Sequence, residues 1–218
     1  MTALYRYLMT SVLLSQRYLP PTLIFLAAMA VGTTSDNGPL QSSYAFCVLA
    51  MLVCTTWLAV SIVNHEDRTQ YQITLVMIGS MLRVLAMTVV VVLTWCVPLL
   101  VIGLIYPIVT GKHDVTTGDV VVGAAAQLGA AMIGVAIGLL CSRLIIPRIG
   151  IAMLTAAAAI LAVLLIRWIS PVRPLMTVLS NERSAGHNAE PLTLLAALCL
   201  AFLLAAVFVT RAVADRKE

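Results

Sequence analysis

Residues that could take part in chemistry are concentrated in one short segment, residues 64–84, with the sequence NHEDRTQYQITLVMIGSMLRV. It holds a histidine, two acidic residues and two arginines, and it lies between two long apolar runs. Such side chains can form an active site, a metal site or a charged contact with another molecule. The rest of the sequence distinguishes among these three uses.

Catalysis finds little support in the remainder of the chain. An active site inside a membrane generally needs an ionisable residue at mid-depth, where a charge costs about 2.5 to 3.5 kcal/mol. No long apolar run has Asp, Glu, Lys, Arg or His at its centre, and the H-E-x-x-H, G-x-S-x-G and G-x-x-x-x-G-K-[ST] motifs are absent from the sequence. We therefore expect no catalytic residue, and the same lack disfavours transport coupled to protons or sodium.

A metal site is not predicted either. His65, His113 and His187 lie in three different loops, so we expect three separate, solvated side chains. The cysteines all fall inside apolar runs without C-x-x-C spacing, and we expect small buried hydrophobic side chains rather than disulfides or metal ligands. They are Cys47, Cys54, Cys96, Cys141 and Cys199.

The composition indicates an integral membrane protein. Of the 218 residues, 61% are hydrophobic and only 10% are charged, whereas roughly 25% are charged in an average soluble domain. A spanning helix needs about 20 mostly apolar residues, so the length allows about six spans. The net charge of +4 comes from arginines scattered at the ends of apolar runs, a pattern typical of membrane orientation rather than of nucleic-acid binding.

The predicted fold is all-α, a single transmembrane domain over residues 1–218. Residues 2–17 place Leu4, Leu8 and Val12 at helical spacing and predict an N-terminal interfacial helix within residues 1–17. Pro20 and Pro21 suit the first turn of a retained span better than the apolar core of a secretory signal, the competing interpretation. The spans are predicted at residues 18–34, 44–64, 84–111, 120–144, 151–168 and 191–213, with a cytoplasmic segment at 65–83 and an extracytoplasmic connection at 169–190 that can re-enter the membrane edge.

Three further structural expectations concern the spans themselves. Pro98 is expected to kink the long third span. The short loop between the spans at 120–144 and 151–168 predicts a tight antiparallel pair. Threonines within the spans are expected to bond to the carbonyl one turn back in their own helix.

Charge placement predicts that both termini lie in the cytoplasm. With six spans, the side of the termini carries nine basic residues, and the opposite loops carry three, namely Lys112, Arg173 and Arg183, with Arg167 at the boundary. By the positive-inside rule the richer side is cytoplasmic. The nine are Arg6, Arg17, Arg68, Arg83, Arg143, Arg148, Arg211, Arg216 and Lys217.

Small residues recur every four positions in the fourth predicted span. They are Ala126, Ala130, Gly134 and Gly138. Such a stripe lets another helix approach closely, within the same subunit, which is the favoured interpretation, or at a subunit interface. Two polar residues of the spans, Thr56 and Gln127, are weak candidates for a substrate pathway, although structural hydrogen bonding is the favoured explanation; the pathway is otherwise unknown.

The polar segment itself is predicted to form a short helix on the cytoplasmic membrane surface. Asn64 or Asp67 can cap it, and Ile73, Met77 and Met81 then fall on one face with helical spacing. An ordinary amphipathic loop resting on lipid headgroups explains the spacing equally well. The acidic start weighs toward a protein partner, because carboxylates are repelled by an anionic leaflet.

This order of parts resembles the membrane subunits of ABC-2-type ABC transporters. The strings SQRYLPP before the first span, Trp57 in the second and NHEDRTQYQIT after it look like a branch of small actinobacterial ABC-type permeases. That branch often has proline after the acidic pair, where this chain has Arg68. The resemblance covers most of the chain in layout and these short strings in detail.

The resemblance implies a function by analogy. The chain would be the membrane-spanning subunit of an exporter of a hydrophobic or amphipathic molecule, such as a peptide, an antibiotic-like compound or a lipid, in a bacterial plasma membrane. A separate ATPase subunit would bind ATP and Mg, so that no cofactor is expected in this chain, and a second membrane subunit, identical or homologous, would complete the pathway. Residues 65–83 would form a coupling segment, with a cytoplasmic coupling helix between the second and third spans, that contacts the ATPase. Its contact residues would be Glu66, Asp67, Arg68, Gln70, Tyr71, Ile73, Thr74 and Met77.

Two other classes of function stay open from the sequence. The chain could be a non-transporting membrane scaffold or an immunity-type protein that binds a partner protein. A membrane-embedded enzyme acting on lipids is the weaker alternative. In all three readings membrane lipid is a partner and nucleic acid is not.

Overall fold

A computed structural model of the chain describes residues 2–33, 40–65, 68–111, 116–142, 145–146, 148–165 and 189–215. Every regular element within these ranges is an α-helix, so the prediction of an all-α fold is confirmed. The helices are α1 (Thr2–Ser15), α2 (Leu19–Thr33), α3 (Leu40–Val63), α4 (Arg68–Ile78), α5 (Met81–Thr110), α6 (Thr117–Leu140), α7 (Ile149–Leu165) and α9 (Ala189–Asp215).

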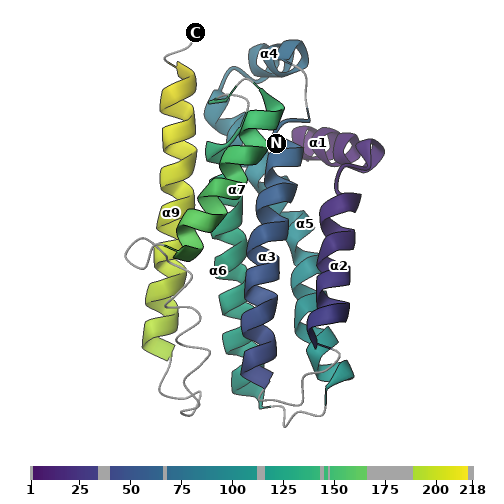
Figure 1. The fold of residues 1–218 in the computed structure, drawn as a ribbon. Helices are drawn as coiled ribbons and strands as arrows, with labels where there is room; N and C mark the ends of the chain where they lie inside the picture. Colours follow the sequence, from purple (N-terminus) through teal and green to yellow (C-terminus); the bar gives the residue numbers. More distant parts are fainter. Residues whose placement is uncertain are drawn as a thin grey trace.

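The helices form a bundle with two helices lying across one end of it (Figure 1). The chain alternates in direction through α2, α3, α5, α6, α7 and α9, with α7 oblique to the others, while α1 and α4 lie across the end where α9 finishes. We call this the α1/α4 end, and the opposite one, where α3 and α6 begin, the far end.

Helix length and composition make this a multi-pass membrane protein. Four stretches are long and apolar enough to cross a membrane: Ser42–Val63, Met81–Thr110, Thr117–Leu140 and Thr193–Val213. The other two predicted spans are α2, with 15 residues, and α7, with 17. At 1.5 Å per residue these helices are about 22 and 26 Å long, short of the hydrocarbon thickness of about 30 Å. The helices α1 and α2, bent by 70° at their junction, would give a fifth span if they are counted as one.

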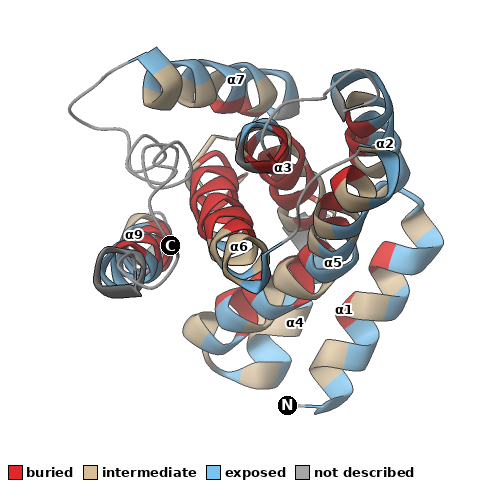
Figure 2. Cartoon of the chain, turned by 90° about the horizontal axis from the view of Figure 1, so that it is seen from below, coloured by how far each residue is buried: buried red, intermediate tan, exposed pale blue. Residues whose placement is uncertain are grey.

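The centre of the bundle is the contact between α3 and α6, both of which are largely buried (Figure 2). The small-residue stripe of α6 makes this close approach possible. A Cβ atom at Gly134 would lie 3.0 Å from the carbonyl oxygen of Leu52, and one at Gly138 would lie 3.2 Å from that of Thr56. Because Ala126 and Ala130 are fully buried as well, the stripe is used for packing within the subunit.

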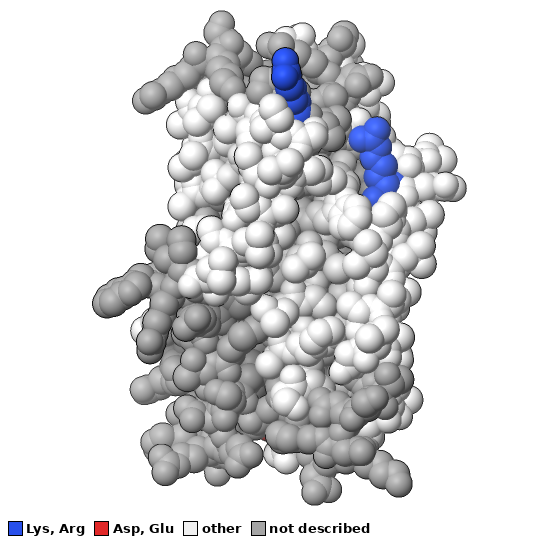
Figure 3. Space-filling model, viewed as in Figure 1, with Lys and Arg blue, Asp and Glu red and all other residues white. Residues whose placement is uncertain are grey.

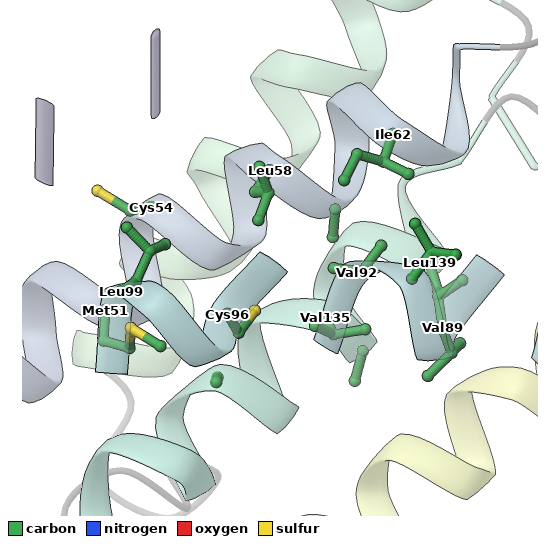
Figure 4. Close-up of a cluster of buried hydrophobic side chains, with 14 of the residues drawn as sticks. Met51, Cys54, Leu58, Ile62, Val89, Val92, Cys96, Leu99, Val135 and Leu139 are labelled. Atoms are coloured by element: carbon green, nitrogen blue, oxygen red, sulfur yellow. The ribbon is translucent and has the colours of Figure 1, made fainter. Parts of the chain in front are cut away.

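Aliphatic and sulfur-containing side chains of three helices fill the interior between α3, α5 and α6 (Figure 4). All five cysteines are free and buried, as the sequence predicts. Threonine hydroxyls are also satisfied as expected, because Thr55, Thr88 and Thr94 each donate to the carbonyl four residues earlier, at 2.7 to 3.0 Å. Close packing rather than polar bonding therefore holds the middle of the bundle together.

Several details of the sequence prediction change. The expected tight pair of the fourth and fifth spans is wrong: α6 ends at Leu140, α7 begins at Ile149, and α6 packs mainly on α3 and α9, while α7 contacts α3 more than α6. The long connection before α7 lets it turn away from α6. The helix predicted as the third span, α5, begins at Met81 and is continuous through Pro98 and Pro107; the kink expected at Pro98 stays a prediction. Most of the predicted re-entrant connection, residues 169–188, lies outside the described residues.

Candidate functional site

The polar segment between α3 and α5 contains a helix, α4, as the periodicity predicts. Gly79 sets its orientation: with φ of 67° it adopts the left-handed conformation that favours glycine, and its N–H donates to the carbonyl of Leu75 at 2.8 Å. Gly79 is thus the single residue between Ile78, where α4 ends, and Ser80, the N-cap of α5. The helix consequently lies across the bundle instead of continuing into α5 (Figure 1).

Two faces of α4 differ in burial. Tyr71, Leu75 and Ile78 are half-buried, and α4 packs against the start of α5. On the other side Ile73 is 58% exposed and Met77 is 83% exposed. The apolar spacing of the sequence therefore marks an open surface of the subunit rather than its packing contact.

The predicted contact residues of the coupling segment fall into three groups. Gln70, Ile73 and Met77 are exposed, with Val76 beside them. Tyr71 and Thr74 are half-buried, and the hydroxyl of Thr74 donates to the carbonyl of Gln70 at 3.0 Å. Helix α4 begins with the backbone of Arg68, whereas Glu66, Asp67 and the side chain of Arg68 lie outside the described residues.

Helix α1, predicted to be interfacial, is attached to the same end of the bundle. Leu8 and Val12 are buried, in agreement with the predicted apolar stripe. The hydroxyl of Tyr5 donates to Thr94 Oγ1 of α5 at 3.4 Å. The Nε2 atom of His65 lies 2.9 Å from the hydroxyl oxygen of Ser11 and 3.0 Å from its carbonyl oxygen. A carbonyl only accepts, so Nε2 carries a proton in this geometry.

The expectation for His65 was therefore wrong. A lone loop histidine is usually solvated, but this one is half-buried and tied to α1 across 54 positions of sequence. No periodicity could have linked it to Ser11, because the contact depends on how α1 folds back over the end of α3. As a result, the residues leading into α4 are joined to α1.

The bend between α1 and α2 adds two more contacts. Arg17 donates from Nη1 to the carbonyl of Asn64 at 3.5 Å, beside the last residues of α3, where a positive charge is favoured by the helix dipole. The rings of Tyr18 and Trp95 stack with centroids 4.3 Å apart. The α1/α4 end is thus a connected assembly of α1, the end of α3, α4 and the start of α5.

Among the side chains that the structure describes, charge is distributed unequally between the two ends of the bundle. Every arginine of this set lies on the α1/α4 side, and some of them are seen in Figure 3. They are Arg6, Arg17, Arg83, Arg148 and Arg211. The one described acidic side chain, Asp119, lies in the first turn of α6 at the far end.

The two weak pathway candidates lie in contacts between helices. Thr56 is buried where α3 meets α6, and its hydroxyl donates to the carbonyl of Leu52 at 2.7 Å. Gln127 is fully buried and donates from Nε2 to the carbonyl of Gly103 on α5 at 3.3 Å. Both polar groups thus bond to backbone carbonyls. Within the described ranges, no cluster of three or more His, Cys, Asp or Glu side chains could hold a metal ion.

No family model, curated protein or solved structure matches this chain.

Proposed function

We propose that this chain is the membrane-spanning subunit of an ATP-driven transporter of the ABC-2 type, and that α4 is the helix on which a separate ATPase subunit pushes. The observation that carries the proposal is α4 itself. It is a short helix held across the end of the bundle, with the open face of Ile73, Val76 and Met77 turned away from its own subunit. Because α4 contacts α5 directly, force applied to it reaches a long apolar helix.

The connected α1/α4 end supports this assignment. Helix α4 is joined to the bundle at both ends. The Gly79 turn joins it to α5, and the contact between His65 and Ser11 joins the residues before it to α1. Displacing α4 would therefore move both α1 and the start of α5. The acidic residues before it, Glu66 and Asp67, suit charged contacts with a protein partner better than an anionic lipid surface.

The arginine distribution supports a cytoplasmic position for the α1/α4 end. In the proposed topology all six bundle helices cross the bacterial plasma membrane, with α2 and α7 matched to it by local thinning or by their flanking residues. Both termini are then cytoplasmic, on the same side as ATP. The residues at the far end, including Asp119, are extracytoplasmic.

A complete transporter would contain two such membrane subunits, identical or homologous, and the ATPase would hold ATP and Mg. The surface available to a second subunit is apolar, with exposed side chains along α5 and α9. The transported molecule would be hydrophobic or amphipathic, since the described residues of the spans carry no Asp, Glu, Lys, Arg or His at mid-depth. Peptides, antibiotic-like compounds and lipids fit this class.

The test is co-purification of the chain with its ATPase, followed by measurement of ATP hydrolysis. Asp67→Lys reverses a charge before α4, and Ile73→Asp places a carboxylate on its open face. We expect both changes to weaken the complex and to lower ATPase stimulation. If neither changes complex formation or stimulation, the assignment of α4 is wrong.

A matched control separates docking from membrane insertion. Leu14 lies at the same end on α1 and is 80% exposed, so Leu14→Asp makes a comparable change on a neighbouring surface. The proposal requires Ile73→Asp to weaken ATPase binding more than Leu14→Asp does. Equal effects of the two changes would indicate that α4 rests in lipid and does not contact an ATPase. Co-purification of a partner that lacks ATPase activity would favour the scaffold function.

A further inference from the structure

Pro107 creates a weak point in α5 near the far end of the bundle. Proline has no N–H, so the carbonyl of Gly103, four residues earlier, lacks its usual donor within the helix. In a membrane, such a freed carbonyl must be satisfied by neighbouring helices. Gln127 of α6 does this from its Nε2 atom at 3.3 Å. Tyr44 of α3 donates its hydroxyl to the next carbonyl, that of Leu104, at 3.4 Å.

Both of these hydrogen bonds are long for their type. The usual range is about 2.7 to 3.2 Å for an N–H donor and about 2.5 to 3.0 Å for an O–H donor. Gln127 is also only half satisfied: its Oε1 atom is buried and has no hydrogen-bond partner among the described residues. An unpaired buried acceptor carries a desolvation penalty. This penalty is relieved if water reaches the side-chain amide of Gln127.

On both sides of this point α5 keeps one buried and one exposed face. Before it, Val92, Cys96 and Leu99 are buried in the interior (Figure 4), whereas Val97 is 57% exposed. After it, Pro107 is buried, whereas Ile105 is 53% exposed and Val109 is 74% exposed. Gly103 lies on the buried face, where an added Cβ atom would lie 2.5 Å from Gln127 Oε1 and 3.3 Å from the ring of Phe25, so a side chain there would displace the Gln127 amide.

We propose that Gly103 and Pro107 form a hinge in α5, about which residues 104–110 move away from α3 and α6. The hydrogen bonds from Gln127 and Tyr44 to α5 hold the hinge closed, and we call these two bonds the latch. The proline removes one hydrogen bond that would resist bending, and the glycine removes the side chain that would block it. Releasing the latch exposes the carbonyls of Gly103 and Leu104 at the end of the bundle opposite to α4. The hinge belongs to this chain alone and operates without any ATPase.

The decisive variants separate the hydrogen bond from the packing. Gln127→Leu removes the donor and keeps a similar volume. Pro107→Ala returns an N–H to the helix, so that the Gly103 carbonyl no longer depends on Gln127. Tyr44→Phe removes a single oxygen and provides a milder change if Gln127→Leu fails to fold. The control is Thr110→Val, since the hydroxyl of Thr110 bonds only within α5, to the carbonyl of Tyr106 at 2.8 Å.

The measurement is the distance between spin labels at Val109→Cys on α5 and Val121→Cys on α6, in the purified chain in lipid nanodiscs. Both positions are exposed, and the five native cysteines are buried, so a chain lacking the two new cysteines gives the labelling background. One interhelical hydrogen bond of about 0.6 to 1 kcal/mol corresponds to roughly a three- to five-fold change in a population. Gln127→Leu is expected to enlarge the longer-distance population by that factor.

Tyr44→Phe should act in the same direction, and Thr110→Val should leave the distances unchanged. Adding Pro107→Ala to Gln127→Leu should restore the wild-type distribution. The hinge is refuted if folded Gln127→Leu and Tyr44→Phe chains both give the wild-type distances. It is also refuted if Pro107→Ala rescues nothing, because Gln127 would then act by packing and not through the Gly103 carbonyl.

Discussion

The contact between α3 and α6 allows a sharp prediction about one added methyl group. In Gly134→Ala the new Cβ would lie 3.0 Å from the carbonyl oxygen of Leu52 and 3.1 Å from the amide nitrogen of Thr56, and it would also meet the Thr55 hydroxyl. Two of these three neighbours are backbone atoms, which cannot rotate away. The helices must therefore separate by a few tenths of an ångström along their closest contact.

The cost can be estimated from two opposing terms. Overpacking a close contact costs about 1 to 3 kcal/mol, whereas replacing glycine by alanine inside a helix gains roughly 0.5 to 1 kcal/mol. The net loss is then up to about 2.5 kcal/mol, which for a chain of this size lowers the unfolding midpoint by up to roughly 10 °C. Gly150→Ala is the matched control, since a Cβ at Gly150 meets nothing within 4 Å.

The assay is thermal unfolding of both variants in the same detergent, followed by the loss of the monodisperse peak in size-exclusion chromatography. Gly134→Ala should lower the midpoint, while Gly150→Ala should leave it unchanged or raise it. A midpoint for Gly134→Ala that is equal to or above that of Gly150→Ala would refute the close α3–α6 contact. The stripe of small residues would then have another use, such as a subunit interface.

The remaining predictions concern the α1/α4 end and its orientation. Gly79→Ala should strain the left-handed turn at φ of 67° and cost about 1 kcal/mol, seen as faster proteolysis between α4 and α5. Ser11→Ala should loosen α1 by removing its side-chain contact with His65, giving faster hydrogen exchange in residues 2–15, and an unchanged rate would contradict the attachment. A membrane-impermeant thiol reagent should label Gln70→Cys only from the cytoplasmic side and Thr116→Cys only from outside, and the reverse result would invert the topology.

Local patterns in the sequence predict most of the helices. Apolar length predicts α3, α5, α6 and α9, and the spacing of Ile73 and Met77 predicts α4. These patterns do not predict which helices are in contact with one another. The oblique path of α7, the choice of α3 as partner for the α6 stripe, and the fully buried Tyr44 packed against Gly123 all depend on contacts between distant residues.

The same limit applies to the candidate site. The periodicity of α4 marks its apolar face, but only its position on the bundle makes Met77 an open surface residue. The link between His65 and Ser11 joins positions 54 residues apart, and a single loop histidine carries no signal for it. The hydrogen bond from Gln127 to Gly103 is a partial exception. A proline inside a helix leaves the carbonyl four residues earlier without its usual donor, so Pro107 predicts that the Gly103 carbonyl needs a donor from another helix.

The most direct test of ATPase docking is photo-crosslinking from α4 in intact membranes. A photoreactive side chain in place of Met77, which is 83% exposed, probes the open face of α4, and one in place of Leu154, which is 74% exposed on α7, serves as the control. We predict that position 77 crosslinks to an ABC ATPase, more strongly when nucleotide is added, while position 154 does not. Crosslinks to lipid alone at position 77, as at position 154, would contradict the proposed function.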